Sequence, residues 1–120
     1  MSNILIIDDE PNVRLLIRKM LEPDGHIITE ASDGIEGIKS YHDNPIDIII
    51  TDLIMPEKEG LETIHELKKE YPALKIIAMS GNNKIHLDTA KLLGAEFVLV
   101  KPFKKEELLL TIQELISIEK

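Results

Sequence analysis

The stretch IDIIITDLIMP, residues 46–56, decides the fold, because its run of β-branched residues ends abruptly in one carboxylate, Asp52. An apolar run without polar alternation is typical of a central strand in a parallel sheet, where helices cover both faces. Pro56 and Gly60 then force the chain to turn. We therefore predict Asp52 at the carboxyl end of a buried strand, where a carboxylate either pairs with a cation or takes part in chemistry.

Length and composition indicate one acidic domain over residues 1–120, of which 43% are hydrophobic. The formal net charge of −8 argues against direct binding to nucleic acid or to an anionic membrane, and favours a protein partner. Cysteine is absent, which excludes disulfides and thiolate chemistry. No apolar run is long enough to span a bilayer and no signal-peptide pattern opens the sequence, so we expect a cytoplasmic protein.

The rest of the chain alternates between short apolar runs and segments with helical spacing. Further strands are predicted over residues 3–7, 26–30, 75–79 and 97–100, and helices over 11–20, 34–43, 61–71, 83–93 and 105–118. Such alternation predicts an α/β, doubly wound fold with a parallel sheet covered by helices on both faces. The expected buried helix faces are Val13, Leu16, Ile17 and Met20; Ile35 and Ile38; Leu61, Ile64 and Leu67; and Leu108, Leu109, Ile112, Leu115 and Ile116.

Four of the five predicted strands end in polar or charged residues. Asp8 and Asp9 follow the first strand, Asp52 ends the third, Ser80 follows the fourth and Lys101 follows the fifth. Doubly wound sheets bind their ligands at the carboxyl ends of the strands. We therefore expect these side chains to form one site.

This set of residue types is suited to phosphoryl chemistry. Carboxylates that repel one another are most simply held together by Mg²⁺, with Asp9 and Asp52 as direct ligands, Asp8 in the outer shell and a main-chain carbonyl after Asp52 completing the set. Lys101 and the Ser80 hydroxyl offer a charge and a donor to phosphoryl oxygens. A carboxylate is also a nucleophile that can form an acyl phosphate.

Each of these residues also has a purely structural interpretation. The acidic pair can favour a helix N-terminus, Ser80 can cap a helix, and Lys101 can be a surface lysine or a structural partner of Asp52. Their occurrence together at equivalent strand ends favours a functional site over these separate interpretations.

The chain resembles the receiver domain of two-component response regulators along essentially its whole length. The motifs that carry the resemblance are Asp8-Asp9-Glu10-Pro11, Asp52-Leu53-Ile54-Met55-Pro56 with Gly60, Ser80-Gly81, and Gly94-Ala95 leading to Lys101-Pro102-Phe103.

The resemblance implies a flavodoxin-like sheet of five strands in the order 2-1-3-4-5 with five helices. It implies Mg²⁺ bound by Asp9, Asp52 and the main-chain carbonyl of Ile54, and contacts from Ser80 and Lys101 to the phosphoryl group. A sensor histidine kinase or phosphotransfer protein would phosphorylate Asp52, and the domain would signal to a downstream protein. It would be a switch that catalyses only its own phosphorylation and dephosphorylation.

Three further features of the sequence add expectations. The family usually has Tyr or Phe three positions before the motif lysine, where this chain has Val98, and strand alternation puts the neighbouring Phe97 on the opposite face. The Lys101-Pro102 bond is predicted to be cis, because the chain must turn sharply after its last strand. In the loop after Asp52, the residues Glu57-Lys58-Glu59 differ from the small or apolar residues that are commoner in the family.

Two other function classes compete with this interpretation. An aspartate-nucleophile phosphohydrolase would also use Mg²⁺, but haloacid-dehalogenase-like enzymes have a second acid two residues after the nucleophile, where Ile54 stands here. A flavodoxin-like cofactor protein is disfavoured because no Gly- or Ser/Thr-rich phosphate loop follows the first strand.

Overall fold

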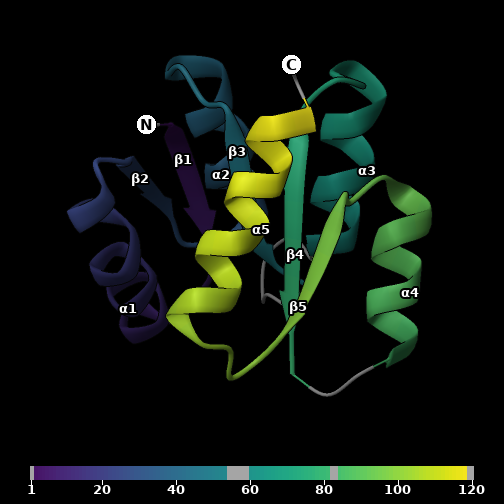
Figure 1. Cartoon of the computed structure of the whole chain (residues 1–120). Coiled ribbons are helices and arrows are strands. Elements are labelled where there is room, and N and C mark those ends of the chain that lie inside the picture. Colours follow the sequence, from purple (N-terminus) through teal and green to yellow (C-terminus); the bar gives the residue numbers. More distant parts are fainter. Residues whose placement is uncertain (1, 54–59, 82–83, 119–120) are drawn as a thin grey trace.

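The computed structural model describes residues 2–53, 60–81 and 84–118, and these form five strands and five α-helices in strict alternation (Figure 1). The predicted elements are all present, with boundaries that move by one or two residues; the second strand, for example, begins one residue later than predicted. The elements are β1 (Asn3–Ile7), α1 (Pro11–Leu21), a 3-10 turn (Glu22–Asp24), β2 (Ile27–Ala31), α2 (Gly34–Asp43), β3 (Ile48–Asp52), α3 (Gly60–Glu70), β4 (Lys75–Ser80), α4 (Lys84–Leu93), β5 (Phe97–Val100) and α5 (Lys105–Ile118).

The sheet has the order β2-β1-β3-β4-β5, and all four strand pairs are parallel. The fold class, with its strand order of 2-1-3-4-5, is therefore confirmed. The register pairs Ile7 with Thr51, Asp52 with Met79, and Ser80 with Val100. These pairs keep the carboxyl ends of four strands close to the same level, which creates one rim at the lower end of the view in Figure 1.

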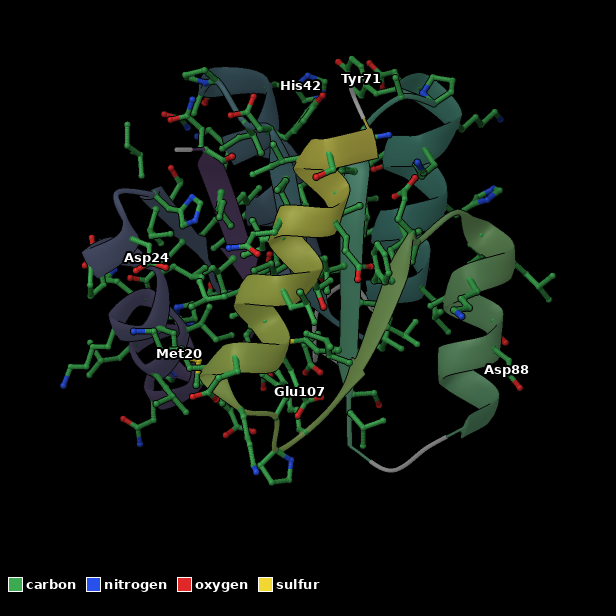
Figure 2. All side chains as sticks on the ribbon, viewed as in Figure 1. Met20, Asp24, His42, Tyr71, Asp88 and Glu107 are labelled. Carbon is green, nitrogen blue, oxygen red and sulfur yellow. The ribbon has the colours of Figure 1, made fainter. Side chains whose placement is uncertain are left out.

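Helices cover both faces of the sheet, so the central strands are buried on both sides. One face packs against α2, α3 and α4, and the other packs against α1 and α5. Figure 2 shows Met20 reaching from α1 toward α5, and both helices contribute to the same core cluster. Every residue of β3 is buried, as its unbroken apolar sequence predicts.

Two helix faces differ from their predicted ones. Ile35 is 61% exposed, and α2 instead turns Gly34 and Gly37 toward the sheet, with Ile38 packed against the core. A Cβ atom on Gly37 would overlap the side chain of Ile7, so the glycine allows α2 to lie close to β1. The spacing of apolar residues did not predict this face of α2, because the residues that it turns toward the sheet are glycines. On α1, Leu16 is 55% exposed, whereas its predicted companions pack into the core.

None of the helices in the described part of the chain is long and apolar enough to cross a bilayer.

Candidate functional site

The rim at the carboxyl ends of the strands carries the predicted site residues. Asp8 and Asp9 follow β1, Asp52 is the last residue of β3, Ser80 is the last residue of β4, and Lys101 follows β5. Residues separated by up to 93 positions in sequence are thereby in direct contact, as the ion pair between Asp8 and Lys101 shows.

Asp8 is fully buried and is held at several atoms. Its Oδ1 accepts a hydrogen bond from the Glu10 main-chain N–H at 2.9 Å, and its Oδ2 accepts one from Lys101 Nζ at 3.0 Å. Its own N–H donates to the Ala31 carbonyl at 3.1 Å, which ties the end of β1 to the end of β2. Both carboxylate oxygens of Asp8 are thus already engaged by the protein.

Asp52 lies beside the ion pair of Asp8 and Lys101 and is 8% exposed. Its Oδ1 is 3.3 Å from Lys101 Nζ, so the lysine bridges Asp8 and Asp52. The Asp52 main-chain carbonyl accepts a hydrogen bond from the Thr51 hydroxyl at 2.9 Å. A Cβ atom on Gly60 would overlap that same carbonyl, so a glycine is required where α3 begins against the end of β3.

Burial and neighbouring charges change the pKa values of Asp52 and Lys101. Burial raises the pKa of Asp52, the positive charge of Lys101 lowers it, the negative charge of Asp8 raises it, and the net shift is upward. For Lys101, burial alone would lower the pKa, but the hydrogen bond to Asp8 and the charges of both aspartates outweigh it, so its pKa is raised. The raised pKa of Lys101 keeps its amine protonated. The raised pKa of Asp52 makes its ionised carboxylate more basic.

Asp9 completes an acidic cluster in which oxygen atoms of Asp8, Asp9 and Asp52 all lie within 4.8 Å of one another. Asp9 is exposed, whereas the other two are buried. The cluster therefore has one open side, toward solvent, from which a cation or a phosphoryl donor can approach.

Ser80 and Lys101 are joined through the main chain. The Lys101 N–H donates to the Ser80 carbonyl at 2.7 Å, which holds the ends of β4 and β5 side by side. Ser80 itself is buried. The next peptide bond, Lys101-Pro102, is cis, which confirms the prediction from the sequence.

Comparisons with known proteins identify the family. The family model described as the response regulator receiver domain matches residues 4–113. The chain belongs to this family. Receiver domains are the signalling modules of two-component systems, and they act as switches rather than as turnover enzymes.

Curated relatives of this receiver include both short and long proteins. The chemotaxis protein CheY of Listeria monocytogenes is 33% identical over 112 residues, covering 91% of this chain and 93% of the relative. The response regulator SaeR of Staphylococcus aureus is 34% identical over 119 residues, covering 98% of this chain. The receiver spans about half of SaeR, 51% of its length.

Solved structures agree with the fold. A response regulator receiver domain protein from Clostridium thermocellum superposes with a TM-score of 0.93 at 32% identity, covering 99% of this chain and 97% of that one. The response regulator TrrA of Thermotoga maritima, solved in complex with Mg²⁺-BeF, gives a TM-score of 0.88 at 33% identity, covering 96% and 99%.

The remaining expectations from the resemblance have different outcomes. Val98 packs into the cluster on the α2–α4 face, and Phe97 packs into the cluster on the α1–α5 face, so the ring lies on the opposite side of the sheet from the usual aromatic position, as predicted. The carbonyl of Ile54, expected as a metal ligand, lies outside the described residues, as do Glu57-Lys58-Glu59.

A network of charged residues beside the rim was not predicted from the sequence. Arg14 of α1 donates from Nη1 to the Asp8 carbonyl at 2.6 Å and from Nε to Glu30 of β2 at 2.9 Å. Arg18 donates to the other Glu30 oxygen at 2.8 Å and to Glu22 at 2.7 Å. The signal available in the sequence was an Arg at positions i and i+4 of the first helix, together with a lone acid in the second strand.

Glu30 gives this network a pH dependence. Burial alone would raise the pKa of Glu30, but its hydrogen bonds to Arg18 and Arg14 and their charges outweigh it, so its pKa is lowered in the folded state. The stabilisation is therefore present above the unfolded-state pKa, near 4.3, and is lost as the pH falls through the folded-state pKa. We expect Glu30→Gln to lower the free energy of unfolding by about 1 kcal/mol at pH 7, and by much less at about pH 3.

Urea titrations of Glu30→Gln and wild type at the two pH values measure this difference. Glu22→Gln is the control, because Glu22 pairs with Arg18 alone among the contacts described and is more exposed. A loss that is equal at both pH values would contradict the assigned pKa direction.

Proposed function

We propose that this receiver domain, taken over residues 1–120, accepts a phosphoryl group onto Asp52 in a Mg²⁺-dependent reaction and then signals to a downstream protein. The donor is the phosphohistidine of a sensor histidine kinase or of a phosphotransfer protein. The observation that carries the proposal is the bridging of buried Asp8 and Asp52 by Lys101, next to the exposed Asp9. Family membership supports the same role.

The donor set of the rim fits Mg²⁺. Magnesium takes oxygen ligands, commonly one or two carboxylates with several waters, and oxygens of Asp8, Asp9 and Asp52 lie within 4.8 Å of one another. Asp9 and Asp52 would be direct ligands, together with the carbonyl of Ile54. Asp8 would act from the outer shell, because both of its carboxylate oxygens are engaged by Glu10 and Lys101. When bound, the ion would supply charge neutralisation for the transferring group.

In the proposed transfer, an oxygen of the Asp52 carboxylate attacks phosphorus. An oxygen–phosphorus bond forms while the phosphorus–nitrogen bond breaks, and the donor imidazole leaves with the bonding electrons. Lys101 Nζ, which is 3.3 Å from the Asp52 carboxylate, would then move onto the phosphoryl oxygens and offset their charge. Ser80 would donate its hydroxyl to another phosphoryl oxygen. Slow attack by water on the acyl phosphate would later return the resting state.

We infer that the donor docks on an apolar groove beside Lys101. Leu16 borders this groove, and its side chain is 55% exposed instead of being buried in the core. A donor that covered this groove would also contact Lys101, which lies 3.3 Å from the Asp52 carboxylate. The groove is lined by Val13, Leu16, Ile17, Met20, Lys101, Pro102 and Phe103.

Incubation with acetyl phosphate, a small phosphoryl donor, tests this function. With Mg²⁺, we expect intact-mass spectrometry to show a gain of one phosphoryl group per chain, with little release of inorganic phosphate. Without Mg²⁺, under EDTA, the gain should be absent. Continuous turnover of the donor without accumulation of phosphoprotein would instead favour the phosphohydrolase alternative.

A further inference from the structure

Arg14 reaches back from the first turn of α1 to the end of β1. Its Nη1 donates to the main-chain carbonyl of Asp8 at 2.6 Å, while its Nε donates to Glu30 at 2.9 Å. Only 16% of the Arg14 side chain is exposed. The planar guanidinium therefore joins α1 and β2 to the residue that follows β1, at one point beside the acidic cluster.

The partner of Arg14 is itself fixed. Arg18 holds the second oxygen of Glu30 at 2.8 Å, so the carboxylate is bound on both sides. The Asp8 N–H is also held, by the carbonyl of Ala31 in β2. Arg14 is consequently anchored to a carboxylate of β2 that a second arginine also holds.

The Asp8 carbonyl matters because it belongs to the same planar peptide unit as the N–H of Asp9. A hydrogen bond that fixes this carbonyl also fixes the plane of the Asp8–Asp9 peptide, and with it the direction in which Asp9 leaves the strand. Asp9 is exposed, so burial in the core does not hold its side chain in place. The position of its carboxylate therefore depends strongly on the main chain before it.

We propose that Arg14 is a positioning residue for Mg²⁺ binding, which it promotes by orienting the Asp8–Asp9 peptide. This inference rests on the proposed function, since Asp9 is there a direct ligand. Groups that orient metal ligands from outside the coordination shell commonly change metal affinity by about 10- to 100-fold when they are removed.

Arg14→Lys tests the proposal, because lysine keeps the charge but has one nitrogen and cannot reproduce the fork between Asp8 and Glu30. We expect Mg²⁺ alone, titrated by calorimetry without any phosphoryl donor, to bind about tenfold more weakly than to wild type. Arg18→Lys is the matched control. It makes the same change one turn further along α1 and also loses a Glu30 contact, but Arg18 has no described contact with Asp8. For this control we expect less than about a twofold change.

A second readout separates positioning from general destabilisation. In metal-free protein, the amide NMR signal of Asp9 should shift in Arg14→Lys and stay in place in Arg18→Lys, while thermal unfolding midpoints fall similarly in both. Equal effects of the two variants on Mg²⁺ affinity, or no effect of either, would overturn the positioning role and leave the proposed function standing. Wild-type protein that bound no Mg²⁺ would overturn both.

Discussion

Lys101→Ala should slow phosphorylation of Asp52 by acetyl phosphate by a factor of about one hundred or more, because it would remove the cation that stabilises the transferring group in the proposed reaction. The same change should leave Mg²⁺ binding intact or make it tighter. Lys101 Nζ sits between Asp8 and Asp52, at 3.0 and 3.3 Å, where it offsets the repulsion that a metal ion would otherwise relieve. A slower phosphorylation rate without any loss of Mg²⁺ affinity is the result expected from this arrangement.

Rates of mass gain under saturating Mg²⁺, and calorimetric titration with Mg²⁺ alone, measure the two effects. Lys104→Ala is the matched control, because it removes the same charge from an exposed position three residues away. Phosphorylation of Lys101→Ala at the wild-type rate would show that the lysine does not act on the phosphoryl group. A large loss of Mg²⁺ affinity would contradict the competition between lysine and metal.

Asp9→Asn should weaken Mg²⁺ binding by about tenfold or more, and Asp8→Asn should weaken it less. The difference follows from the geometry. Asp9 is the exposed member of the cluster, whereas the oxygens of Asp8 already bind Glu10 and Lys101. Calorimetry on both variants, with Asp24→Asn as a control of equal charge change on an exposed residue away from the rim, provides the comparison. Equal losses for Asp8→Asn and Asp9→Asn would contradict the division into outer and direct ligands.

The sequence predicted the strands well because their signal is strong and local. The isoleucine run before Asp52 could only be satisfied by a strand buried on both faces, and β3 is buried throughout. Once the strands are parallel, the residues that follow them must share one rim, so the neighbourhood of Asp8, Asp52 and Lys101 followed from strand order alone.

What the sequence could not supply was contact made through main-chain atoms. Arg14 donates to the Asp8 carbonyl, and Gly60 packs against the Asp52 carbonyl. Helix α2 approaches the sheet through the main chain at Gly37, whereas the side chain of Ile35 is exposed. Carbonyls are present at every residue, so a residue that recognises one leaves no pairing pattern in the sequence. A glycine chosen for close approach likewise carries no hydrophobic signal.

The central claim is that Asp52 is the phosphoacceptor, and locating the phosphoryl group tests it most directly. After incubation with acetyl phosphate and Mg²⁺, the acyl phosphate can be trapped by reduction with borohydride, and the modified residue identified by peptide mass spectrometry. We predict modification of Asp52 in the wild type and in Glu30→Gln, and no modification of the chain in Asp52→Asn. Modification of Asp8 or Asp9 in the wild type, or undiminished phosphorylation of Asp52→Asn, would contradict the account.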